Sequence, residues 1–234
     1  MRPYYGHHGM KQFIRGKPIR YAFKIWCLVR PDGFLVKFYP YTGAGNKIAG
    51  KILGSSVTEK LCLKCVSIGL YVHMDNYFTS LPSNNDLFCV GTIRNDRTEK
   101  VPLQDISKAA RCTCCAVEDK ENGITLLRWH DKNQVNLVTN LKDEKIFDIG
   151  RCGRGKKSER NRVSVPRPNI VKLYNKQMGG VDLFDKLRGH YRIRIRSRKW
   201  YWPLFRFGLN ESIVNLWILF RCIQRNISLL EFTR

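Results

Sequence analysis

Residues 70–75 read LYVHMD, a short and mostly apolar stretch that ends in a carboxylate. Aromatic and β-branched residues favour a strand over Leu70–Met74, whereas the segment before it repeats Val57 and Leu61 at helical spacing. Helical stretches alternate with short strands in this way along the chain, and both hairpin and crossover connections are expected, so the sequence predicts an α/β fold. Because α/β sheets present ligands at the carboxyl ends of their strands, Asp75 is the first candidate functional residue.

Two hairpins are predicted on either side of this strand. The triplets Pro31-Asp32-Gly33 and Asp131-Lys132-Asn133 separate runs of β-branched and aromatic residues, as turns in hairpins do. Helical spacing is expected again from Ser80 to Val90. The pattern then weakens between Asn95 and Gly123, and residues 151–167 carry seven basic residues and one acid, a composition typical of a flexible basic loop.

The C-terminal part is predicted to be helical. Apolar residues follow helical spacing in 169–178, in 181–191 and, at greatest length, in 203–223. We therefore expect one domain over residues 1–234, with an irregular insertion at about 90–165 and a C-terminal helical part at about 169–225.

The charge of the chain points to a polyanionic partner. Its 234 residues include 42 Lys and Arg against 19 Asp and Glu, a formal net charge of +23, and nucleic acid is the first interpretation of such an excess. Charged and amide side chains interrupt the apolar stretch 203–220, which argues against a transmembrane span. Nine cysteines, an odd number in a chain of this size, favour reduced thiols inside the cell.

Two further acids are candidates for metal binding. Asp182 and Asp185 lie three residues apart at the start of a predicted helix and so project from one face. A carboxylate at a strand end together with carboxylates on a helix supplies the hard oxygen ligands of Mg²⁺ or Mn²⁺. The ordinary alternative is that acids in a first helical turn complement the helix dipole. No structural zinc is expected, because the cysteine spacing fits no compact zinc site.

A basic segment follows these acids, with aromatic residues interleaved and no acid between residues 186 and 206. Its candidate DNA-binding residues are Lys186, Arg188, Arg192, Arg194, Arg196, Arg198, Lys199 and Trp202. Phosphate neutralisation combined with aromatic platforms is typical of proteins that hold distorted or single-stranded DNA. The alternative is a solvated basic face on which Trp200 and Trp202 anchor the following helix in the core.

Five motifs in a fixed order connect these features to a known family. They are Asp75-Asn76-Tyr77-Phe78-Thr79-Ser80, Gly91-Thr92-Ile93-Arg94, Arg128-Trp129-His130-Asp131-Lys132, Tyr174-Asn175-Lys176-Gln177-Met178-Gly179-Gly180-Val181-Asp182 and Lys199-Trp200-Tyr201. The order and content of these motifs, together with the opening Met1–Trp26, resemble the piggyBac transposase family, which includes domesticated transposable element-derived members. The resemblance runs along nearly the whole chain.

The resemblance implies a ribonuclease H-like mixed sheet with flanking helices and a triad of catalytic aspartates. On this match Asp75 is the second catalytic aspartate and Asp182 the third, both as metal ligands, with Asp185 a further acid beside them. The family's first aspartate ends a strand just upstream of Met1, so we expect the sheet in this sequence to lack its first catalytic strand. Trp202 looks like the tryptophan with which the family packs against opened DNA.

Two functions remain open on these grounds. The first is metal-dependent DNA strand cleavage and joining at transposon ends in the nucleus, by a chain that acts alone or as a homodimer. The second is a catalytically inactive remnant that binds DNA or chromatin. Because two-metal chemistry needs carboxylates that hold both ions, and the first aspartate is expected outside this sequence, we expect salt-sensitive DNA binding without cleavage from the 234 residues alone.

Overall fold

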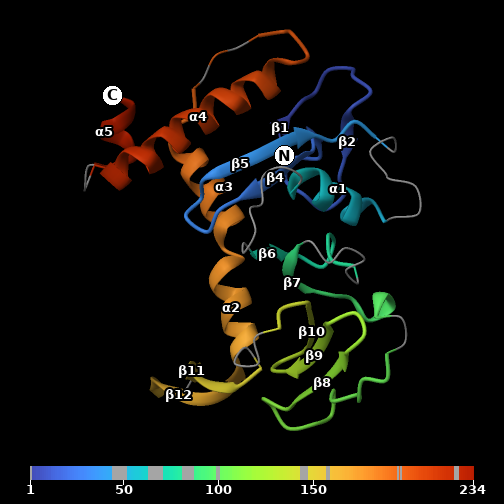
Figure 1. Cartoon of the computed structure of the whole chain (residues 1–234). Helices are drawn as coiled ribbons and strands as arrows, with labels where there is room; N and C mark the ends of the chain where they lie inside the picture. The colour runs from blue at the N-terminus through green and yellow to red at the C-terminus, as the bar shows by residue number, and fades with distance from the viewer. Residues whose placement is uncertain are drawn as a thin grey trace. The chain divides into compact units, whose positions relative to one another are not determined.

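The structure is a computed structural model, and it describes two compact units separately (Figure 1). The first unit joins Met1–Cys65 to Gly179–Arg234, and the second is Val66–Met178. The described residues are 2–43, 52–62, 71–80, 87–98, 101–142, 147–156, 159–193, 195, 197–223 and 227–234, with side chains described throughout except at 151–164.

Two small antiparallel sheets form the β-structure of the first unit. The first has the order β1-β3-β2, and the second is the hairpin β4-β5. Their strands are β1 (Arg2–Pro3), β2 (Lys11–Phe13), β3 (Tyr21–Phe23), β4 (Ile25–Val29) and β5 (Leu35–Pro40). The predicted turn at Pro31-Asp32-Gly33 is confirmed: the Asp32 carboxylate accepts a hydrogen bond from the Phe34 N–H at 3.1 Å, and Gly33 takes a φ of +88°, which favours glycine.

Four helices complete the first unit: α1 (Leu53–Cys62), α3 (Gly180–His190), α4 (Trp202–Ile223) and α5 (Leu229–Thr233). A core of Leu35, Phe184 and Phe207 joins β5, α3 and α4, and Trp217 of α4 packs with Leu229 of α5. Figure 1 shows α4 alongside β5. The helices expected at 181–191 and 203–223 are therefore confirmed. Among the described residues, no helix combines the length and hydropathy needed to cross a membrane.

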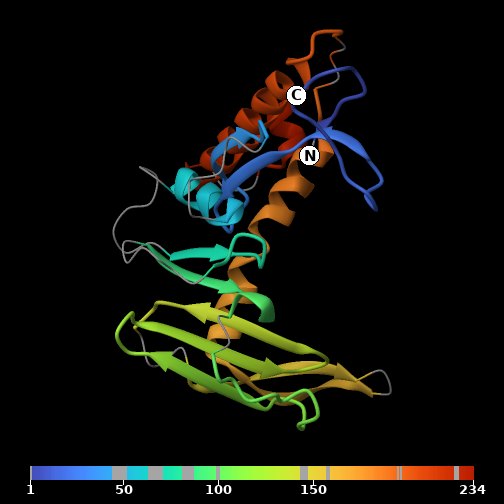
Figure 2. The same ribbon diagram turned by 90° about the vertical axis from the view of Figure 1, so that its right-hand side faces the viewer.

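The second unit is built on a five-stranded mixed sheet of order β6-β7-β10-β9-β8, in which β6 and β7 are parallel and the other pairs antiparallel. Figure 2 shows this sheet with the separate hairpin β11-β12 nearby. Helix α2 (Asn169–Gln177) buries Ile170 and Val171 against Leu127 and Leu137 of the sheet. The elements before α2 are β6 (Tyr71–Met74), β7 (Phe88–Thr92), the 3₁₀ turn η2 (Asn95–Arg97), β8 (Cys114–Asp119), β9 (Ile124–His130), β10 (Gln134–Thr139), β11 (Ile149–Lys156) and β12 (Glu159–Pro168).

Three expectations for this unit were wrong. The helix expected at Ser80–Val90 is not found at its C-terminal end, where β7 begins at Phe88, and residues 81–86 lie outside the described part. A short apolar run does not distinguish a buried strand from a helix, and here pairing with β6 decides. The insertion at about 90–165 is not irregular, because it contains β8 to β10 and most of the hairpin β11-β12. Residues 151–167, expected to be a flexible basic loop, belong to that hairpin in their described part.

Candidate functional site

Asp75 lies where the sequence predicts it, directly after β6 and exposed to solvent. Its backbone carbonyl accepts hydrogen bonds from the Phe78 N–H at 2.9 Å and from the Thr79 hydroxyl at 3.0 Å. Its carboxylate accepts one from the Asn76 N–H at 2.6 Å. The turn after the strand thus fixes the backbone of Asp75 and leaves a carboxylate oxygen open to a ligand.

Arg97 and Gly91 hold this turn against the sheet. One terminal nitrogen of Arg97 donates to the carbonyls of Asn76 at 2.8 Å, Tyr77 at 3.3 Å and Thr79 at 3.2 Å. Thr79 is fully buried, and a Cβ added to Gly91 of β7 would lie 2.3 Å from its hydroxyl oxygen. The close packing of the turn on β7 therefore requires glycine at this position.

Two residues from other motifs lie near Asp75. The hydroxyls of Thr92 and Tyr174 are hydrogen-bonded at 3.2 Å. Burial raises the pKa of Tyr174, the hydrogen bond with Thr92 opposes this, and the negative charge of Asp75 raises the pKa further. The structure thus brings together the Asp75, Gly91 and Tyr174 motifs, which sequence reasoning quoted separately, and neither Thr92 nor Tyr174 was predicted as a site residue. The signal available in the sequence was that Thr92 and Tyr174 both belong to the ordered motifs that resemble the piggyBac family.

Asp182 and Asp185 lie together on α3, in the other unit, and both are exposed. Asp182 is in the first turn of α3, where the helix dipole favours an acid. The start of this helix is placed by Gly180, because a Cβ there would lie 2.6 Å from the Arg30 carbonyl oxygen in the β4-β5 turn. Asp185 forms an ion pair with Arg188 one turn later, so its charge is already matched within the helix.

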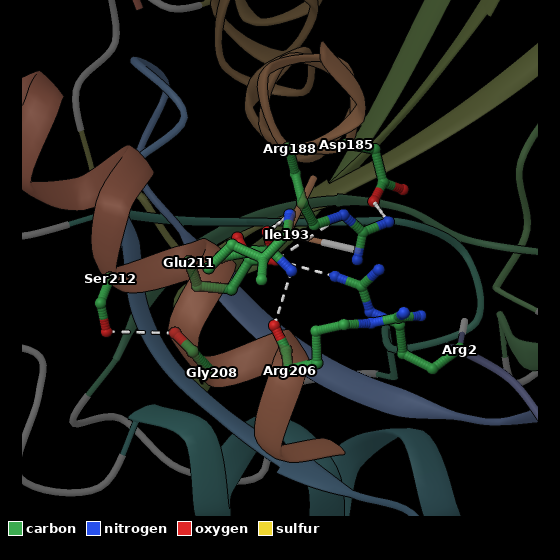
Figure 3. Close-up of polar contacts among 9 residues, drawn as sticks. Arg2, Asp185, Arg188, Ile193, Arg206, Gly208, Glu211 and Ser212 are labelled. Carbon is green, nitrogen blue, oxygen red and sulfur yellow. Dashed lines mark hydrogen bonds and ion pairs between the residues drawn. The ribbon is translucent and has the colours of Figure 1, made fainter. Parts of the chain in front are cut away.

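A buried charge network extends from this pair (Figure 3). Glu211 of α4 is 2% exposed and binds Arg2 of β1 at 3.2 Å, with the Arg188 Nε at 3.7 Å. Arg188 is 7% exposed and Arg2 4% exposed. Arg188, which the sequence analysis placed among the DNA contacts, has its guanidinium enclosed between Asp185 and Glu211 and 5.5 Å from the Phe207 ring centre. In this structure it is buried and paired and not exposed to a ligand.

Burial dominates the electrostatics of this network. It raises the pKa of Glu211 to about 7, although Arg188 and Arg2 both lower it and Asp185 raises it slightly further. Burial also lowers the pKa of Arg2 to about 10, and the nearby Arg188 charge acts in the same direction. Sequence reasoning missed the network. The available signal was Glu211 itself, since an acid in an apolar helix is rarely fully buried unless it has a partner.

The basic segment between α3 and α4 is held to α4 by its backbone. The Ile193 N–H donates to the Asn210 side chain at 2.9 Å, and the Trp202 indole N–H donates to the Ile195 carbonyl at 3.0 Å. Trp200 is 42% exposed and stacks on His8 with ring centres 4.1 Å apart, so it does not anchor α4 in the core.

Most of the predicted cationic residues in this segment are open to a ligand. The exposed ones are Lys186, Arg192, Arg198 and Lys199. Arg194 and Arg196 lie outside the described residues. Trp202 is half-buried at the start of α4. In the described part of the chain, no three His, Cys, Asp or Glu side chains are grouped so that they could hold a metal ion.

Comparisons with known proteins identify the family of the chain. Residues 1–217 match the family described as Transposase IS4. Two human proteins, PiggyBac transposable element-derived protein 2 and PiggyBac transposable element-derived protein 3, are each 32% identical over the whole chain. The chain covers 42% of the first and 41% of the second, so it spans less than half of the length of these relatives.

A solved structure shares the fold. The cryo-EM structure of a piggyBac transposase synaptic complex with hairpin DNA superposes with a TM-score of 0.76 over 98% of this chain and 48% of that chain, at 21% identity. The family match covers nearly the whole sequence and the similar proteins are piggyBac-derived. The chain therefore belongs to the Transposase IS4 family, and within it to the piggyBac transposases and the proteins derived from them.

Proposed function

We propose that this chain is part of the catalytic domain of a piggyBac-type DNA transposase, with a ribonuclease H-like sheet, acting in DNA strand cleavage and joining in the nucleus. The observation that carries the proposal is the exposed Asp75 at the carboxyl end of β6, in a turn held by Arg97, within a chain whose match to a transposase family covers residues 1–217. The parallel pair β6-β7 supports the ribonuclease H-like assignment. That the first catalytic strand lies upstream of this sequence stays a prediction.

The proposed metal ligands are Asp75 and Asp182. Carboxylate oxygens are the donors that Mg²⁺ and Mn²⁺ prefer, and both side chains are exposed, so neither has to leave a buried partner to bind an ion. Bound there, Mg²⁺ would supply activation of the attacking oxygen and charge stabilisation at the leaving oxygen of the phosphodiester. Asp185 is proposed as a supporting acid, and it is paired with Arg188, which also lies beside Glu211.

DNA is the proposed partner, and the first unit is its proposed main contact. This unit contains 23 Lys and Arg against 6 Asp and Glu, which is +17 of the total net charge of +23. Exposed cations in the segment before α4 are suited to phosphate contacts. The structurally similar piggyBac transposase was solved in a synaptic complex with hairpin DNA, which supports DNA as the partner of this chain. A homodimer is compatible with this function and stays a prediction.

A second candidate function is DNA binding without catalysis. The concentration of positive charge in the first unit favours it, because phosphate binding by Lys and Arg needs neither a metal ion nor Asp75 and Asp182.

One assay separates the two candidates. The 234-residue chain is incubated with a labelled transposon inverted-repeat end and Mg²⁺ or Mn²⁺, alongside Asp75→Asn, Asp182→Asn and, as a matched control, Asp32→Asn in the β4-β5 turn. Nicking that disappears in the first two variants and persists in the control supports the transposase. Duplex binding without nicking is the result expected of the 234 residues alone, because the first aspartate is expected outside this sequence. It supports the second candidate only if nicking stays absent when a strand carrying that aspartate is added upstream, and the absence of duplex binding contradicts both.

A further inference from the structure

An exposed aromatic pair lies on the β1-β3-β2 sheet. Phe13 of β2 and Tyr21 of β3 are opposite each other in the antiparallel register, with ring centres 5.2 Å apart. Phe13 is 56% exposed and Tyr21 43% exposed. Opposed aromatic rings on a strand pair stabilise it, but this contact leaves about half of each side chain exposed to water.

Positive charge surrounds this pair. The Lys11 ammonium lies 5.2 Å from the centre of the Tyr21 ring. The turn between β2 and β3 adds the exposed Arg15, Lys17 and Arg20. The first 31 residues contain seven basic residues and no acid. The surface around the aromatic pair is therefore complementary to a polyanion.

A row of rings connects this sheet to the basic segment before α4. Tyr4 stacks on Phe23 of β3 with ring centres 4.7 Å apart, and His8 meets the same ring edge-on at 5.6 Å. On its other side, His8 stacks on Trp200, which follows the exposed Arg198 and Lys199. Figures 1 and 2 both draw the turn after β1 beside the segment that precedes α4. The sheet therefore continues the surface proposed above for phosphate contacts.

We propose that Phe13 and Tyr21 form a stacking surface for the unpaired bases of single-stranded DNA, with the cations of the β2-β3 turn holding its phosphates. The inference rests on the proposed function in that it takes DNA as the ligand, but it adds a site and a state of the DNA. Proteins that bind single strands combine aromatic stacking platforms with a cationic track in this manner. Duplex DNA offers phosphates but keeps its bases stacked on one another, so it cannot use the rings.

The test compares three ligands of equal length, about 12 nucleotides, which lies within the usual site size of a single-strand-binding surface. They are fluorescently labelled oligothymidylate, the same backbone with abasic residues, and duplex DNA. Fluorescence anisotropy gives the Kd of the full 234-residue chain for each. The variants are Phe13→Leu, Tyr21→Leu and Tyr21→Phe, and the control is Tyr71→Leu, which removes a ring of similar exposure, 56%, from β6.

We expect the unmodified chain to bind oligothymidylate about tenfold or more tightly than the abasic strand, because stacking contributes roughly that much per base. Phe13→Leu and Tyr21→Leu should each weaken oligothymidylate binding about five- to tenfold, with duplex and abasic binding changed less than about twofold. Tyr21→Phe keeps the ring and should bind like the unmodified chain, as should the Tyr71→Leu control.

Each other outcome is decisive. Equal affinity for oligothymidylate and the abasic strand overturns the stacking surface without any mutation, and so does an equal loss on all three ligands in the leucine variants. If duplex binding is intact while single-strand binding is absent, the proposed function stands and this inference fails. If the chain binds none of the three, both fail.

Discussion

Glu211 is a single residue whose ionisation depends on its surroundings in a measurable way. Burial raises its pKa in the folded chain to about 7, from an ordinary value of 4.5. Between these two values the folded chain binds more protons than the unfolded one, so the free energy of unfolding decreases as the pH rises through this range. The difference between the two pKa values lowers the free energy of unfolding by about 3 kcal/mol once Glu211 is fully ionised.

The variant Glu211→Gln removes this titration. We expect thermal melts to show that the stability of the unmodified chain falls, relative to the variant, between about pH 4.5 and pH 7.5. If attraction to Arg2 and Arg188 outweighed burial, the unmodified chain would instead gain stability over the variant as the pH rises. Glu231→Gln, at the exposed start of α5, is the control. Relative to this variant, the unmodified chain should lose no stability over the same pH range, because the pKa of Glu231 is lowered in the folded chain.

Gly91 makes a second prediction at the scale of one residue. Gly91→Ala should lower the free energy of unfolding by about 1–3 kcal/mol, because the new Cβ would lie 2.3 Å from the Thr79 hydroxyl oxygen and 2.9 Å from its methyl carbon. In a Thr79→Ala background the same change should cost less, since both crowding atoms are gone. Urea denaturation of the four proteins measures this coupling, and additive effects would contradict the packing argument.

At the scale of elements, Asn215 joins α4 to β5. Its side chain accepts a hydrogen bond from the Leu35 N–H at 2.9 Å and donates one to the Leu35 carbonyl at 2.8 Å. Asn215→Ala leaves both backbone groups without these partners and should cost about 2–3 kcal/mol in urea denaturation. Ser212→Ala, an exposed position on the same helix, should change stability by less than about 0.5 kcal/mol. If Asn215→Ala lowers the free energy of unfolding as little as Ser212→Ala does, α4 is held to β5 by apolar contacts alone.

The elements that the sequence predicts best are those whose local pattern agrees with their final packing. The helices near 169–178, 181–191 and 203–223 and the β4-β5 hairpin follow from periodicity and turn residues. The strand β7 does not, because its apolar run fits a helix until β6 pairs with it. The hairpin β11-β12 was predicted to be a loop, because its basic residues show no strand pattern. Its strands form by pairing with each other, which composition does not indicate.

The candidate site divides in the same way. The positions of Asp75 after a strand and Asp182 in a first helical turn follow from local sequence. The hold of Arg97 on the turn after Asp75 depends on contacts about 20 residues apart, and the pair of Arg2 and Glu211 joins residues 209 positions apart. Long-range partners of this kind leave no local pattern, which explains why Arg188 was predicted at the DNA and is found in the interior.

At the scale of the whole molecule, the affinity for DNA can depend either on the total charge of the chain or on where that charge lies. Both units are basic, but the first carries +17 of the net +23. If binding followed net charge alone, the removal of any two cations would weaken it equally. If phosphates contact the segment before α4, cations of that segment should matter more than cations of the second unit, because the counterions released on binding come from the contacted phosphates.

Two double variants with the same change in net charge test this. Arg198→Gln/Lys199→Gln removes two exposed cations from the first unit, and Lys108→Gln/Arg111→Gln removes two exposed cations from the second. In duplex DNA titrations at several salt concentrations, the first should reduce the slope of log affinity against log salt by about 2, whereas the second should leave the slope nearly unchanged. Equal reductions in both would mean that the field of the whole chain, and not a contact surface in the first unit, holds the DNA.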